Sequence, residues 1–261
     1  QMCGPLALVA VVAGGWVTRR RGVAVALVWF GTAIKLYPAA AFALFLRRRD
    51  VRSLVGGAAL TAFFLVGAPA LVLGVRGARK FFQKIEPYLT AAAGTPDPNS
   101  QSLGHYLART FEAAPSWLPW LAAALLLGTA AWLLHRAGGE GEGDDVADDA
   151  RLDRYTIFLA LSLIPLLVPT AWANYFAYLP PLAAFLAAEA QAVASPAGKR
   201  VAEAMAAAII LASSFVAADL AGGWDAYVRS GVLLFASLTA ALLALALLAR
   251  RPRSLPRIFE V

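Results

Sequence analysis

The chain lacks the motifs that usually mark nucleotide and metal sites. It has one cysteine, Cys3, among 261 residues, so no internal disulfide can form and the redox compartment stays undefined. A Walker phosphate loop, a dinucleotide-binding glycine motif and a metal-binding Cys/His spacing are absent from the sequence. We therefore expect no metal, no cofactor and no ATP-driven transport. Strand-like alternation and fixed-period repeats are also absent, which favours helices.

Hydrophobic sequence is abundant instead. Hydrophobic residues make up 60% of the chain and its mean hydropathy is +0.66, whereas a soluble domain has an apolar content of about 45–50%. Apolar segments recur at about 3–17, 22–46, 51–74, 117–134, 155–190, 201–218 and 231–249. The segment 155–190 is too long for one crossing of about 20 residues, and Pro169 interrupts it. The pattern predicts an all-α, polytopic transmembrane bundle, with residues 1–261 forming a single integral membrane domain.

The formal net charge of +7 does not indicate a nucleic-acid partner. The basic residues cluster at the ends of the apolar runs, where they set membrane topology. We therefore expect the lipid bilayer, and no nucleic acid, as the partner of this charge.

Lys35 lies in the middle of the apolar run 22–46, and an arginine triplet flanks each end of that run. A lysine near the bilayer centre costs roughly 3 kcal/mol or more on insertion scales, so it needs a structural or functional reason. Because basic residues favour the cytoplasm, the run is predicted to enter the membrane, break near Pro38 and return. A re-entrant run leaves sixteen Lys and Arg residues inside and six outside, against nine and thirteen for a full crossing. The alternative is a tilted helix whose lysine snorkels or lines the bundle interior.

Two predicted loops have distinctive compositions. The outer loop, about 75–116, contains Phe81 and Phe82 among basic residues, which predicts a short amphipathic helix on the membrane surface. The inner loop 137–154 carries seven of the sixteen acidic residues. Its glycines and charges predict a flexible, acidic cytoplasmic linker.

Polar residues gather in three places on the predicted outer side. These are Lys35, the run from Gln101 to Arg109, and the turn from Trp172 to Tyr175. Each has a purely structural alternative: an interior lysine, an ordinary amphipathic loop helix, and aromatic anchors at the membrane interface. Their common side favours a shared site.

The residue types in these three places suit a lipid carrying a phosphate and a sugar. The ammonium of Lys35 gives a point charge and the guanidinium of Arg109 a planar fork, and both can hold phosphate oxygens. Amide and hydroxyl groups such as those of Gln101, Ser102 and Asn174 suit sugar hydroxyls. Such cations would stabilise a phosphate as it leaves.

The order and spacing of these motifs resemble glycosyltransferase family 87 across nearly the whole chain. The motifs are Ile34-Lys35-Leu36-Tyr37-Pro38, then Gln101-Ser102-Leu103 with Arg109, then Pro169-Thr170-Ala171-Trp172-Ala173-Asn174-Tyr175. The family pattern has asparagine where Ser100 stands and histidine where Asn174 stands, so His105 becomes a candidate for the missing histidine.

The resemblance implies a GT-C membrane enzyme that uses polyprenyl-phosphate-mannose, of the kind labelled alpha-1,2-mannosyltransferases. It implies transfer to an extracytoplasmic glycolipid or glycan, in a multi-pass bacterial cytoplasmic (inner) membrane protein. The substrate-binding residues that we expect are Lys35, Tyr37, Gln101, Ser102, His105, Arg109, Trp172, Asn174 and Tyr175. No residue of the chain is assigned as catalytic, because the general-base aspartate is expected in a first outer loop upstream of Gln1.

Two other functions remain open at this point. A broken helix with a cation inside the membrane is also typical of a transporter or flippase for lipid-linked sugars. A catalytically dead relative that scaffolds other envelope proteins is the third reading.

Overall fold

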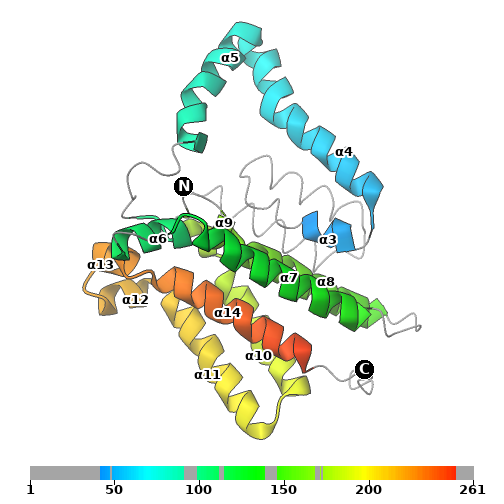
Figure 1. Cartoon of the computed structure of the whole chain (residues 1–261), viewed down its shortest axis with the longest axis vertical. Helices are drawn as coiled ribbons and strands as arrows, with labels where there is room; N and C mark the ends of the chain where they lie inside the picture. The colour runs from blue at the N-terminus through cyan, green and yellow to red at the C-terminus, as the bar shows by residue number, and fades with distance from the viewer. Residues whose placement is uncertain are drawn as a thin grey trace. The chain divides into compact units, whose positions relative to one another are not determined.

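The computed structural model describes residues 42–47, 49–90, 99–111, 115–138, 146–167, 171 and 173–250 (Figure 1). Within these ranges all regular structure is helical, which confirms the all-α class. The chain divides into two compact units, 1–97 and 98–261. The prediction of one integral membrane domain stays a prediction, and the two units are described separately.

In the first unit, α3 (Phe42–Arg47) precedes α4 (Val51–Ala62), a π-helix (Phe63–Gly67) and α5 (Ala68–Thr90). Gly74 interrupts α5 with φ 67° and ψ 165°, a left-handed backbone that glycine adopts without a Cβ clash. The apolar segment predicted over 51–74 thus ends at this kink. Residues after the kink continue as helix, which confirms the helix predicted around Phe81. Phe81 is exposed beside Arg79 and Lys80, and its ring meets that of Phe82 edge-on at 5.6 Å.

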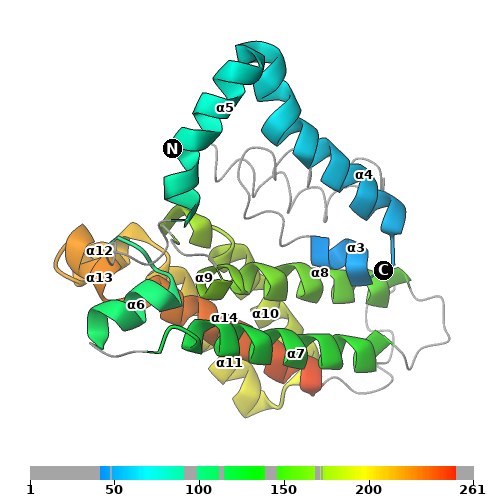
Figure 2. The ribbon, with the colours of Figure 1, turned by 45° about the horizontal axis from the view of Figure 1, so that its top comes forward.

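The second unit contains the remaining helices. They are α6 (Leu103–Thr110), α7 (Leu118–Gly138), α8 (Val146–Ser162), α9 (Ile164–Leu167), the 3-10 helix η3 (Ala173–Phe176), α10 (Leu179–Val193), α11 (Pro196–Ala212), α12 (Phe215–Leu220), α13 (Trp224–Arg229) and α14 (Val232–Ala249). Successive long helices run back and forth, and α14 contacts α7, α8, α10 and α11. Figures 1 and 2 both show α6, α12 and α13 gathered at one end of α14.

We call this end of the second unit the site end; it comprises segment 99–111, the turn 171–176 and α12–α13. The opposite end holds the start of α8, the α10–α11 turn at Ala194 and the end of α14 at Arg250.

The core of the second unit forms where small residues of α14 admit close neighbours. Ala240, Ala241 and Ala244 are buried on α14, and large side chains such as Leu182 and Leu186 of α10 are fully buried. Close contact between helices through small residues is typical of packing inside membranes.

The helix bounds of this unit bear on two predictions, the break in the apolar run 155–190 and the linker over 137–154. The break in the apolar run 155–190 is confirmed, because α8 and α9 end before the turn 171–176 and α10 begins after it. Helices extend into the linker predicted over 137–154, since α7 continues to Gly138 and α8 begins at Val146. The flexible cytoplasmic character of the linker stays a prediction. The apolar face of α8 already begins inside the predicted linker, because Leu152, Tyr155 and Leu159 are buried at helical spacing.

Two of the described helices are long and apolar enough to cross a membrane, over Leu118–Ala137 of α7 and over α14. The apolar α10 is shorter. The seven predicted apolar segments are therefore matched in part, and the re-entrant run 22–46 lies almost entirely outside the described residues.

Candidate functional site

The segment that carries the predicted Gln-Ser-Leu motif is buried. Ser100 and Gln101 have no exposed surface and Ser102 has almost none. Buried polar groups need hydrogen-bond partners, and Ala171 supplies them. The Gln101 backbone N–H donates to the Ala171 carbonyl at 2.6 Å, and the Ala171 N–H donates to Ser100 Oγ at 3.1 Å. These two bonds clamp the motif to the turn 171–176.

The Gln101 side chain extends this clamp to a third segment. Its amide nitrogen donates to the backbone carbonyl of Val228 in α13. Gln101 Oε1 is buried and has no hydrogen-bond partner among the described residues. Gln101 therefore ties the motif to the turn through its backbone N–H and to α13 through its side chain. Its predicted contact with substrate stays a prediction.

Helix α6 follows directly and carries two of the predicted site residues, His105 and Arg109. Ser102 caps its N-terminus, because Ser102 Oγ accepts from the His105 N–H at 3.3 Å. His105 and Arg109 lie four residues apart and so share one face of α6. The Arg109 guanidinium donates through Nη1 to the Ser100 carbonyl at 2.7 Å. The cation of Arg109 is thereby held against the start of the motif.

Tyr106 packs α6 onto the junction between α13 and α14. Its ring meets the ring of Phe235 edge-on, with centroids 5.1 Å apart. A Cβ on Gly231 would lie 2.7 Å from the Tyr106 ring, and Gly231 has a φ of 73°. Only glycine satisfies both constraints at this junction.

The turn that pairs with the motif contains two more of the predicted site residues. Asn174 and Tyr175 lie in the 3-10 helix η3, three and four positions after Ala171. Tyr178, which follows the turn in the chain, anchors it to α14, because the Tyr178 hydroxyl lies 2.6 Å from Ser237 Oγ of that helix. The structure therefore brings together the backbone of this turn with Gln101, Ser102, His105 and Arg109.

Three predicted site residues lie outside the described residues: Lys35, Tyr37 and Trp172. Their relation to α6 and to the turn stays a prediction.

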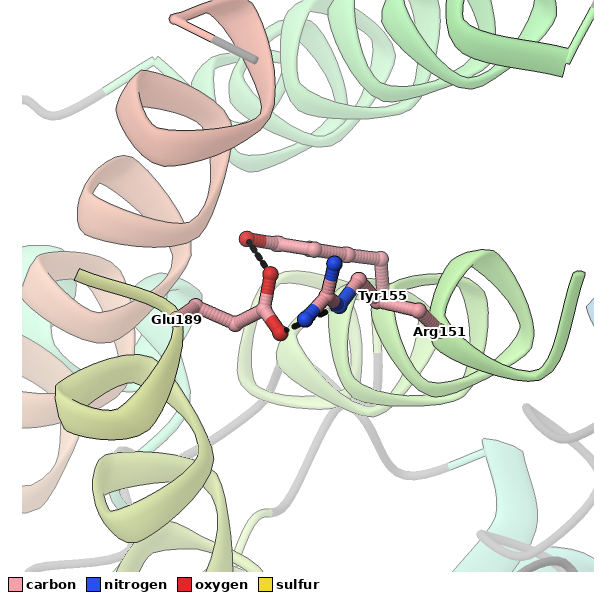
Figure 3. Close-up of polar contacts among 3 residues, drawn as sticks. All are labelled: Arg151, Tyr155 and Glu189. Atoms are coloured by element: carbon pink, nitrogen blue, oxygen red, sulfur yellow. Dashed lines mark hydrogen bonds and ion pairs between the residues drawn. The ribbon is translucent and has the colours of Figure 1, made fainter. Parts of the chain in front are cut away.

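A second polar cluster occurs at the opposite end of the same unit. Arg151 Nε of α8 lies 2.8 Å from Glu189 Oε1 of α10, and the Tyr155 hydroxyl donates to Glu189 Oε2 at 3.3 Å (Figure 3). Sequence reasoning missed this cluster. The available signal was Glu189 itself, a carboxylate inside the apolar run 155–190, which needs a partner when buried.

Across the described ranges, no group of three or more His, Cys, Asp or Glu side chains is placed to hold a metal ion. The polar groups that the structure brings together at the site end are the guanidinium of Arg109, the imidazole of His105, the Gln101 amide and serine hydroxyls.

Comparison with protein families gives one match. The sequence pattern of glycosyltransferase family 87 matches residues 4–147, more than half of the 261 residues. The chain belongs to glycosyltransferase family 87. The match includes the buried motif and α6, and it ends before the turn 171–176. No curated protein and no solved structure matches the chain.

Family membership makes the protein a glycosyltransferase. Together with the apolar helices α7 and α14, it indicates a membrane location.

Proposed function

We propose that this glycosyltransferase moves a mannosyl or related group from a polyprenyl phosphate carrier to an extracytoplasmic glycolipid or glycan. The clamp that joins the Ser100–Gln101 motif to Ala171 carries the proposal. It supports a common site for two segments that are 71 positions apart in the chain, with the arginine of α6 beside them.

In this proposal Arg109 and His105 face the donor phosphate. The acceptor hydroxyl oxygen bonds to the anomeric carbon of the sugar, and the bond from that carbon to the phosphate oxygen breaks. The electron pair of this bond leaves with the polyprenyl phosphate, and a general base takes the hydroxyl proton. A cation fixed before the reaction stabilises the charge that develops on the phosphate.

The remaining predicted residues complete the proposed site on sequence grounds. Lys35 and Tyr37 join the donor phosphate side, and Trp172, Asn174 and Tyr175 line the sugar. Gln101 joins segment 99–111 to Ala171 of the turn and to α13, and Ser102 caps α6, through the bonds described above.

The charges of the second unit support an outward-facing site. At the end opposite the site lie six described Lys and Arg residues: Arg136, Arg151, Arg154, Lys199, Arg200 and Arg250. The site end holds two, Arg109 and Arg229. Because basic residues accumulate on the cytoplasmic side, we infer that the site end faces away from the cytoplasm. A lipid-linked donor fits that side, where nucleotide sugars are not supplied.

The test is sugar transfer by the protein in its complete natural length, in vesicles with cell-envelope lipids as acceptor. Polyprenyl-phosphate-mannose and a nucleotide-linked mannose are compared as donors. We expect transfer from the polyprenyl donor alone. Arg109→Ala should lower kcat/KM at least tenfold, a loss of about 1.4 kcal/mol of transition-state stabilisation. Arg109→Lys should retain only part of the kcat/KM that Arg109→Ala loses, because lysine lacks the planar guanidinium fork.

Arg200→Ala is the matched control, because it removes an exposed arginine at the opposite end. Equal losses for the two alanine variants would reject Arg109 as a phosphate contact. Folded protein that transfers from no lipid-linked sugar, but moves such lipids between leaflets, would replace the proposal with a flippase.

A further inference from the structure

The hairpin of α12 and α13 presents large apolar side chains away from the protein at the site end. Phe215 is 83% exposed, Leu220 is 74% exposed, and Val216 and Trp224 are also exposed. We propose that this hairpin lies in the interfacial layer of the lipid bilayer and inserts these four side chains into it. The proposal rests on the membrane location of the proposed function and adds the surface by which the site meets the lipid.

The position of the hairpin along the bundle supports the bilayer interface. Helix α14 has 18 residues and is one of the two helices apolar enough to span. At 1.5 Å per residue it is about 27 Å long, close to the roughly 30 Å of the hydrocarbon core. Its first residue, Val232, therefore lies near the boundary of that core. Helix α13 ends at Arg229, three residues earlier, so it lies at headgroup level.

The inner side of the hairpin is hydrogen-bonded to other segments of the protein. Val228 accepts the Gln101 amide, and the Tyr227 hydroxyl donates to the Ala212 carbonyl at the end of α11 at 2.6 Å. Burial also raises the pKa of Tyr227 to about 12. These contacts hold the hairpin with its apolar residues turned outward.

The exposed residues have the composition of an interfacial surface. The Phe215 and Trp224 rings lie side by side with centroids 6.5 Å apart, and tryptophan is enriched at the membrane–water boundary. The charged residues of the hairpin are Asp219, Asp225 and Arg229, and all three are exposed. We call these three residues the charged rim of the hairpin. Exposed apolar side chains together with charged ones are typical of helices that lie on a membrane without crossing it.

Lipid fits this surface better than a second protein chain, because the same exposure continues along α14. Phe235 and Leu242 of that helix are large, apolar and exposed. A helix that spans the bilayer exposes such residues to lipid, and the hairpin ends where that helix begins. The consequence is that the site end meets lipid at the level of the hairpin.

The experiment places single spin labels on the chain in phosphatidylcholine–phosphatidylglycerol vesicles. Cys3 is first changed to Ser so that each new cysteine is the only one. The labelled variants are Leu220→Cys on the hairpin, Asp225→Cys on its charged rim and Leu242→Cys in the middle of α14. For each label, collision with oxygen, which enters lipid, is compared with collision with a water-soluble nickel complex.

We expect the oxygen-to-nickel ratio at position 220 to exceed that at position 225 several-fold and to fall below that at 242. A lipid-like ratio at 242 with a water-like ratio at 220 would overturn the hairpin proposal alone. Protection of position 220 from both reagents would assign the surface to a protein partner and would also overturn it. A water-like ratio at 242 would overturn the membrane location itself. Transferase activity, measured separately, decides the proposed reaction.

Discussion

The Gln101 backbone N–H donates to the Ala171 carbonyl at 2.6 Å, which joins the start of α6 to the turn between α9 and α10. Neither segment belongs to a long helix, and each has one aromatic side chain packed against the protein, Tyr106 in α6 and Phe176 in the turn. The position of Arg109 relative to Asn174 and Tyr175 therefore depends on a few buried hydrogen bonds. Changes to these bonds should alter the site without dismantling the bundle.

Ser100→Ala tests the clamp. Ser100 Oγ accepts from the Ala171 N–H and the Ser102 N–H and donates to Ser102 Oγ. Removing this hydroxyl leaves a buried N–H without its acceptor, which costs about 1–3 kcal/mol. We expect a lower free energy of unfolding and reduced transfer. Thermal unfolding in detergent measures the first effect. The control is Ser116→Ala at an exposed position, and a Ser100 variant no less stable than this control would contradict the clamp.

Gly231→Ala tests the packing of α6 on α14. The substitution forces alanine into a φ of 73° and brings its Cβ to 2.7 Å from the Tyr106 ring. Gly222 has a φ of 86° but open space around its Cβ position, so Gly222→Ala carries only the backbone strain of about 1–3 kcal/mol. Gly231→Ala should be the more destabilising, as measured by thermal unfolding. In a Tyr106→Ala background the difference between the two glycine variants should vanish; an undiminished difference would mean that the ring is not its cause.

The elements that local patterns determine were predictable. The span of α14 follows from an uninterrupted apolar run, and the break before α10 follows from Pro169. The start of α8 was missed because its first turns carry a run of aspartates, which composition assigns to a linker. Acidic residues are in fact stabilised near a helix N-terminus by the helix dipole, so charge alone does not mark the end of a helix.

The partners of the long-range polar contacts could not be predicted from the sequence. Gln101 and Val228 are 127 positions apart, and nothing in their local sequence selects one carbonyl as the partner of that amide. The motif indicated Gln101 as a residue of interest, whereas its role as a link between three segments required the fold. Glu189 was recognisable as a charge in an apolar run, but its choice of Arg151 among 23 Lys and Arg residues depends on how α8 packs against α10.

Tyr227 gives a pH-dependent prediction. Burial raises its pKa to about 12 in the folded protein, above the value of about 10 for an unfolded chain. The unfolded state therefore loses this proton first as the pH rises. The stabilisation from Tyr227 is complete below about pH 10 and is lost between about pH 10 and 12. Unfolding midpoints over this range should fall more steeply for the parent chain than for Tyr227→Phe. Parallel slopes would show that this hydroxyl is not shielded.

The ion pair at the opposite end predicts an asymmetry between its two partners. The Arg151 side chain is 23% exposed and that of Glu189 only 7%. Glu189→Gln leaves a guanidinium that water can still reach, so its cost should be small. Arg151→Met leaves the carboxylate buried, and among the described residues it then accepts only from the Tyr155 hydroxyl. A buried charge without its partner costs about 3–5 kcal/mol. Thermal unfolding should therefore rank Arg151→Met well below Glu189→Gln.

The double variant Arg151→Met with Glu189→Gln separates the two effects. It should recover much of the stability that Arg151→Met loses, because no buried charge then remains without a partner. Gln191→Ala is the control on the same helix, since Gln191 makes an exposed hydrogen bond to Glu203 and should change stability little. A double variant as unstable as Arg151→Met would mean that arginine acts through packing alone. Transfer rates should follow stability and show no separate loss, because the pair lies at the opposite end of the unit from the proposed site.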